Sequence, residues 1–139
     1  MRNSKNLNLL FIVTILVAAT FLLLSMTTFA PKPWPVPAKY KTMKNAKAGN
    51  KDAEGIGKNL FAQHCKSCHG VKGAGDGKKA AELSTEIRDF GTAAFQSQAD
   101  GEIYYKAIIG RDEMPNFEKK ITAEGDRWLL VNYLRTLKK

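Results

Sequence analysis

The sequence predicts an all-α fold, in which a small helical domain follows a single apolar N-terminal helix. Two observations support this class. Near the C-terminus, Leu130, Leu134 and Leu137 recur at the spacing of one face of a helix. No stretch alternates apolar and polar residues over enough positions to predict a strand.

Residues 1–30 form a leader, in which Arg2 and Lys5 precede an uncharged, largely apolar run from Leu7 to Phe29. Its length predicts a transmembrane anchor, because a membrane span needs about 20 apolar residues, whereas the apolar part of a signal peptide has about 7 to 15. The alternative is that the leader is an export signal cleaved after Ala30.

Residues 31–50 are predicted to form a linker. Proline occupies every second position from Pro31 to Pro37, which favours an extended polyproline II conformation. The following stretch, residues 38–50, is rich in lysine and contains no acidic residue, so it is interpreted as solvated. The remaining residues, 51–139, are predicted to form one domain.

Three helices are expected in this domain. The first covers Ala53 to Gln63, and the second covers Asp100 to Ile109, with acidic residues at its start and Gly110 at its end. The last begins after Thr122, a suitable N-cap. Residues 70–77, rich in glycine, are expected to form a loop. Residues expected in the core are Leu130, Tyr133, Leu134 and Leu137, together with Phe90, Phe95 and Phe117.

The pentapeptide Cys65-Lys66-Ser67-Cys68-His69 contains both cysteines of the chain and has the C-x-x-C-H pattern of covalent c-type haem attachment. Its two thiols can add to the two vinyl groups of one haem, and His69 is placed to bind the iron. A thiol/disulfide motif is the first alternative, but no apolar strand precedes these residues. A zinc site would need more ligands. His64 is interpreted as a partly exposed polar residue.

A second axial ligand is sought among the methionines, which are Met1, Met26, Met43 and Met114. Met1 and Met26 lie in the leader, and Met43 lies in the lysine-rich linker. Met114 is the preferred candidate, because Pro115 biases it toward an extended conformation in a restricted loop between two helical segments.

With these residues identified, the chain resembles the class I cytochromes c over roughly residues 53–139. The resemblance implies a fold of three to five helices wrapped around one covalent haem c. It also implies that a glycine allows the first and last helices to cross closely. The matching pieces are Cys65-x-x-Cys68-His69-Gly70, Met114-Pro115, Gly57-x-x-x-Phe61 and Trp128 to Leu134, with Gly57 and Phe61 expected to meet Leu130, Tyr133 and Leu134.

The resemblance further implies export, because haem of this type is attached outside the cytoplasm. Together with the leader, it predicts a single-pass protein of the cytoplasmic membrane with its haem domain on the periplasmic side. The alternative localisation is an exported protein released by signal cleavage.

An iron bound by His69 and Met114 has no open position for a substrate, so the chain is predicted to be an electron-transfer protein and not an enzyme. The predicted function is transfer of single electrons between respiratory-chain complexes on the outer side of the bacterial cytoplasmic membrane. Expected partners are redox proteins, such as a quinol-oxidising complex and a terminal oxidase. No nucleic acid or small-molecule substrate is expected.

The formal net charge of +9 predicts electrostatic attraction to acidic patches on such partners. Two alternatives remain open. The chain could be a fixed subunit of an oxidase or dehydrogenase complex. If Met114 is not a ligand, it could instead be a haem sensor or enzyme with an open iron site.

Overall fold

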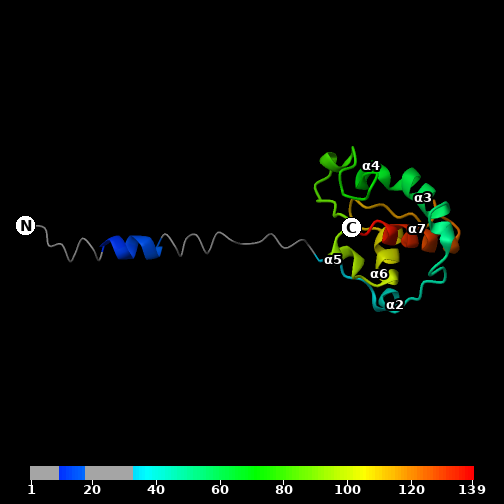
Figure 1. Cartoon of the computed structure of the whole chain (residues 1–139), viewed down its shortest axis with the longest axis horizontal. Helices are drawn as coiled ribbons and strands as arrows, with labels where there is room; N and C mark the ends of the chain where they lie inside the picture. The colour runs from blue at the N-terminus through cyan, green and yellow to red at the C-terminus, as the bar shows by residue number, and fades with distance from the viewer. Residues whose placement is uncertain (1–9, 18–32) are drawn as a thin grey trace, which may run out of the picture. The chain divides into compact units, whose positions relative to one another are not determined.

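The computed structural model of the chain describes residues 10–17 and 33–139. Backbone contacts divide the chain into two units, Met1–Trp34 and Pro35–Lys139. Figure 1 shows the helices of the second unit.

In the first unit, residues 10–17 form a helix whose side chains are exposed. Over residues 10–17 and 33–139, no helix is both long and apolar enough to cross a membrane. This finding contradicts the predicted localisation as a single-pass membrane protein with a periplasmic domain. The other leader positions, and with them the predicted cleavage point, lie outside the described residues.

The second unit is helical, which confirms the predicted all-α class. In the described part of the chain, the only β feature is an isolated bridge between Arg111 and Met114. The α-helices are α2 (Ala38–Lys41), α3 (Ile56–His64), α4 (Lys66–His69), α5 (Ala93–Gln96), α6 (Asp100–Tyr104) and α7 (Glu124–Thr136). Two 3₁₀ turns, η1 (Lys51–Ala53) and η2 (Ala80–Glu82), and a π-helix, η3 (Tyr105–Ile109), complete the unit.

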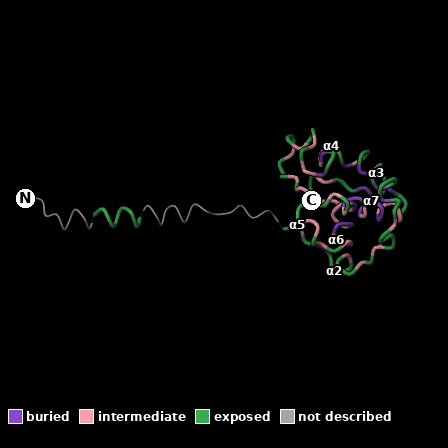
Figure 2. Tube along the Cα trace, in the orientation of Figure 1, coloured by how far each residue is buried: buried purple, intermediate pink, exposed green. Residues whose placement is uncertain are grey.

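Helix α7 is the centre of this unit. It packs against α3 on one side and α6 on the other, as Figure 1 shows. The buried positions in Figure 2 follow these three helices. The acidic Glu124 and Asp126 lie in the first turn of α7, where they complement the helix dipole. The helix buries six side chains, those of Trp128, Leu129, Leu130, Val131, Tyr133 and Leu134.

Helices α3 and α7 approach closely at Gly57. A Cβ atom at this position would lie only 2.3 Å from the backbone oxygen of Leu129 and 2.9 Å from Cβ of Tyr133. One turn later, the ring of Phe61 lies 5.3 Å from the ring of Tyr133. The predicted glycine crossing of the first and last helices is confirmed, with Leu129 as an additional partner.

Two predicted helices differ in detail from the structure. The stretch Asp100–Ile109 is helical, but its second half is the π-helix η3; it ends at Gly110, whose φ of 74° lies in the left-handed region. At the start of α7, the N-cap is Ala123 and not Thr122. The Arg127 side chain instead holds the preceding loop, with its Nε donating to the carbonyl of Ile121 at 2.7 Å.

Residues 35–50, which are part of the linker predicted over residues 31–50, pack on the rest of the second unit. We call them the N-terminal strap. The Tyr40 ring lies 4.7 Å from that of Tyr105. The Tyr40 carbonyl lies so close to Gly101 that a Cβ there would clash with it. Asn45 Nδ2 donates to the Asp100 carboxylate and to Asn132, each at 2.8 Å. The high lysine and proline content of this segment gave no indication that Tyr40 and Asn45 contact the rest of the unit.

Candidate functional site

The C-x-x-C-H residues lie where α3 gives way to α4. Cys65 is the junction: its N–H donates to the Phe61 carbonyl at 2.9 Å, and its own carbonyl accepts from His69 N–H at 2.9 Å. Cys65 is buried and Cys68 is partly buried, and neither forms a disulfide. The helical turn therefore presents two thiols and an imidazole within one short segment.

The environment of Cys65 differs from that of a reactive redox thiol. Burial, and to a smaller extent the neighbouring Cys68, raises the pKa of Cys65 to about 12. Redox-active C-x-x-C motifs depend on the opposite shift, a lowered thiol pKa. The local chemistry thus favours a buried thiol oriented toward the core over the thiol/disulfide alternative.

His69 is a neutral, partly buried imidazole. Burial lowers its pKa to about 4, and its ring stacks on Phe90 with 4.5 Å between ring centroids. Its Nδ1 atom is buried and has no hydrogen-bond partner. An unsatisfied buried polar atom costs about 1–3 kcal/mol, so such atoms are rare. A neutral imidazole is also the form that binds metals, and metal ligation of this side chain would account for its burial.

The loop after His69 folds back over the motif. Gly75 N–H donates to the His69 carbonyl at 2.9 Å, and Gly77 N–H donates to the Cys68 carbonyl at 3.1 Å. A Cβ at Gly77 would lie 2.5 Å from that same carbonyl oxygen, so only glycine permits this approach. The predicted glycine-rich loop therefore fixes the backbone of the C-x-x-C-H turn.

Met114 lies in a tight turn after η3. Arg111 and Met114 exchange two backbone hydrogen bonds, of 2.8 and 2.9 Å, across Asp112 and Glu113. Asp112 has a φ of 52°, in the left-handed region that non-glycine residues seldom adopt. The Met114 side chain is partly buried and packs against the hydrophobic core.

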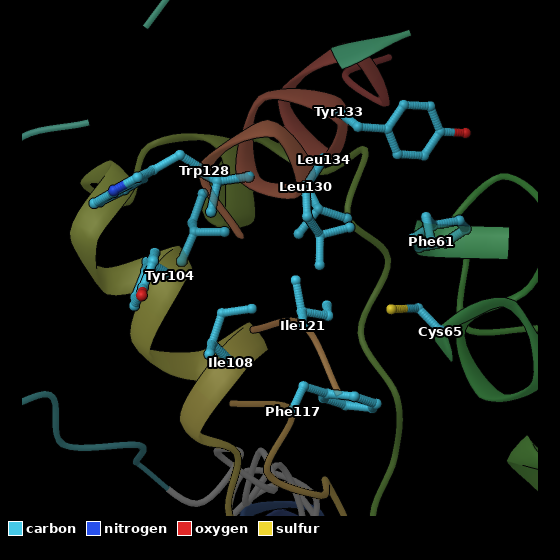
Figure 3. Packing of buried hydrophobic residues seen from close by; sticks show 12 residues of the cluster. Phe61, Cys65, Tyr104, Ile108, Phe117, Ile121, Trp128, Leu130, Tyr133 and Leu134 are labelled. Carbon is cyan, nitrogen blue, oxygen red and sulfur yellow. The ribbon is translucent and has the colours of Figure 1, made fainter. Parts of the chain in front are cut away.

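One apolar cluster connects the C-x-x-C-H segment with the Met114 segment. Cys65, Phe117 and Ile121 all belong to it, and Figure 3 shows the Cys65 sulfur pointing toward the side of the cluster that holds Ile121 and Phe117. The Phe117 ring also lies 5.9 Å from the ring of His64, which is partly exposed. The fold therefore brings both segments to the same apolar surroundings.

Of the other methionines, Met43 is also partly buried against the hydrophobic core, but it lies in a different segment from the Met114 turn. Met43 belongs to the N-terminal strap and packs beside Gly101 at the start of α6. Met1 and Met26 lie outside the described residues. Sequence reasoning missed Glu113, whose carboxylate contacts Ser84 and Thr85. The only indication of this role in the sequence is that Glu113 directly precedes the predicted ligand Met114.

These side chains fit the haem that the sequence predicts. Cys65 belongs to the apolar cluster and Met114 packs against it. The neutral imidazole of His69, with its unsatisfied buried nitrogen, stacks on Phe90, which packs against the same cluster, and Cys68 lies at the attachment spacing from Cys65. Phe90 and Phe95, both expected in the core, lie with ring centroids 4.6 Å apart and pack on that cluster too.

Comparison with known proteins agrees with this fit. Residues 55–138 match the family model named cytochrome c. A solved structure of a protein named "KustC0563 c-type cytochrome" is 35% identical in sequence, with a TM-score of 0.51. The similarity covers 60% of this chain and 98% of that one. No curated protein matches the chain.

Proposed function

Because the chain belongs to the cytochrome c family, we propose that it carries single electrons between redox proteins, with its haem iron bound by His69 and Met114. Haem c is held covalently in this family, here by Cys65 and Cys68, and when bound it supplies one-electron chemistry at its iron. In this proposal Cys65 and Cys68 attach the haem, and His69 and Met114 bind its iron.

The observation that carries the proposal is the state of His69. Its imidazole is uncharged, its ring is fixed against Phe90, and a buried ring nitrogen lacks a partner. A ligand that is already neutral and oriented needs neither to lose a proton nor to reorganise when it binds iron. The fixed backbone of the glycine-rich loop then holds His69 in place.

Met114 completes the coordination in this proposal. A thioether ligand favours ferrous iron and raises the reduction potential. Since both axial positions are then filled, no position remains for oxygen or a substrate. The apolar residues around Cys65 and Phe117 exclude water from the same region. Outer-sphere electron transfer is the activity that remains.

The charge near the motif suggests the kind of partner. Lys66, Lys72, Lys78 and Lys79 are all exposed, and Asp76 is the only acidic residue between positions 65 and 80. A basic surface attracts acidic surfaces and accelerates encounter at low salt. We propose that the partners are respiratory redox complexes, with a quinol-oxidising complex as electron donor and a terminal oxidase as acceptor.

Carbon monoxide tests the proposed coordination, because it binds ferrous haem only where an axial position is open. The reduced, haem-loaded full chain is titrated and followed by its absorption spectrum. We expect the native protein to resist carbon monoxide and Met114→Ala to bind it readily. Met43→Ala, which removes a methionine packed beside α6, serves as the matched control and should behave like the native protein.

Two outcomes contradict the proposal. Ready binding of carbon monoxide by the native protein means that the iron is open, which favours a sensor or an enzyme. Binding of carbon monoxide by Met43→Ala but not by Met114→Ala would mean that Met43, and not Met114, is the methionine that binds the iron.

A further inference from the structure

We propose that Glu113 is a positioning residue that keeps Met114 on the iron, by fastening the Met114 turn to residues 84 and 85. This inference rests on the proposed ligation by Met114. It assigns a role to a side chain that does not itself touch the haem iron.

Three hydrogen bonds support this role. Glu113 Oε1 accepts from Ser84 N–H at 3.1 Å, and Oε2 accepts from Ser84 Oγ at 3.0 Å and from Thr85 N–H at 3.0 Å. Each of these bonds connects the turn with residues 28 or 29 positions earlier in the chain. Hydrogen bonds to a carboxylate are about twice as strong as those between neutral groups.

The turn needs external support because it is strained. Asp112, with φ of 52°, adopts a conformation that costs about 1–3 kcal/mol and persists only where the surroundings impose it. On the C-terminal side, Phe117 N–H donates to the Ile108 carbonyl at 2.8 Å and ties the following residues to η3. The carboxylate of Glu113 supplies a second attachment, immediately beside Met114.

The position of Glu113 separates this role from core packing. Its side chain is exposed, so shortening it leaves no cavity in the apolar cluster. Loss of the carboxylate would instead release the turn from residues 84 and 85. Met114 would then leave the iron more often while the rest of the fold stays intact.

Carbon monoxide binding kinetics measure how often Met114 leaves. The reduced, haem-loaded full chain is mixed rapidly with carbon monoxide as native protein, Glu113→Ala and Glu113→Gln. We expect the binding rate to rise about tenfold in Glu113→Ala, because this variant loses all three hydrogen bonds that the exposed carboxylate accepts. Glu113→Gln retains one acceptor oxygen and should show a smaller rise.

Glu102→Ala is the matched control. Glu102 is an acidic residue whose Oε2 also accepts a backbone hydrogen bond, from Ala99 N–H at 3.0 Å, but at the start of α6. It should leave the carbon monoxide rate unchanged. Urea unfolding of each variant shows any general loss of stability, and the absorption band of the methionine–iron bond in oxidised protein reports the ligand directly.

The outcomes distinguish this inference from the proposed function. If native protein excludes carbon monoxide and Met114→Ala binds it, but Glu113→Ala equals native protein, the positioning role is wrong and the ligation stands. Equal acceleration in Glu113→Ala and Glu102→Ala reflects general loosening and also overturns the role. If native protein binds carbon monoxide readily, the ligation itself fails.

Discussion

Asp89 joins the C-terminus of the chain to the segment that supports His69. Its carboxylate pairs with the Lys139 ammonium and accepts a 2.7 Å hydrogen bond from Gly91 N–H. The Lys139 hydrogen bond, followed by that from Gly91, lowers the pKa of Asp89 below its ordinary value of 3.8. Phe90, the next residue, is the one that stacks on His69.

The lowered pKa of Asp89 predicts a contribution to stability that depends on pH. A carboxyl whose pKa is lower in the folded state stabilises the protein above its unfolded pKa, and this stabilisation is lost as pH falls through the folded value. Native protein should therefore exceed Asp89→Asn in urea midpoint at pH 6, and the difference should shrink once pH falls below about 4.

Urea unfolding of the haem-loaded protein at a series of pH values measures this difference. Glu86→Gln, which neutralises an exposed carboxylate of the same segment, provides the comparison. A difference between native protein and Asp89→Asn that stays constant down to the lowest pH would contradict the assignment.

At the scale of elements, the crossing of α3 and α7 depends on Gly57. A methyl group here would meet the Leu129 carbonyl at 2.3 Å, and backbone atoms in the middle of a helix cannot easily move away. We predict that Gly57→Ala lowers the free energy of unfolding by about 1–3 kcal/mol, the usual cost of overpacking. Urea unfolding of the haem-loaded protein measures it.

Gly55→Ala is the control for this prediction. A Cβ at Gly55, the N-cap of α3, would have an ordinary contact of 3.7 Å with the Asp52 carbonyl. Its effect on stability should be small. Equal losses in the two variants would mean that helix propensity and local backbone effects, and not the crossing, determine the cost.

The N-terminal strap is the part of the predicted linker whose long-range contacts could not be predicted from composition. Its contacts with α6 and α7 depend on the ring of Tyr40, the amide of Asn45 and the glycine at position 101. Each of these contacts joins residues at least 55 positions apart in the chain. The local sequence of the strap is dominated by lysine and contains no sign of these distant contacts.

At the scale of the whole molecule, the surplus of positive charge predicts salt-dependent electron transfer. Oxidation of the reduced, haem-loaded protein by hexacyanoferrate(III), an anion, should be fast at low salt and slow on the order of tenfold as ionic strength rises. With tris(1,10-phenanthroline)cobalt(III), a cationic oxidant, salt should have the opposite effect on the rate. Stopped-flow absorbance gives both rates.

Two charge reversals locate the surface that the anion approaches. Lys72→Glu changes an exposed lysine in the loop after the C-x-x-C-H turn, whereas Lys44→Glu changes an exposed lysine in the N-terminal strap. Both substitutions change the net charge by the same amount. A larger decrease in the hexacyanoferrate(III) oxidation rate for Lys72→Glu than for Lys44→Glu would therefore indicate that the anion approaches near the haem motif. Equal losses would mean that overall charge alone controls the rate.

The sequence by itself determined the features that need only neighbouring residues. Cys65, Cys68 and His69 occupy one turn, so their spacing alone predicted the attachment chemistry. Helical periodicity predicted the all-α class, and the pairing of Gly57 with the last helix followed from resemblance. The predicted single-pass membrane localisation also came from local composition, and it is contradicted, because no helix among residues 10–17 and 33–139 is long and apolar enough to cross a membrane.

Tertiary structure alone decided the features that depend on distant contacts. Burial made His69 neutral, and the apolar cluster brought Phe117 beside His64. Glu113 meets Ser84, which lies 29 positions earlier in the chain. The physical reason is that burial, electrostatics and long-range hydrogen bonds are set by which surfaces meet after folding, whereas motif and periodicity are set by the order of residues along the chain.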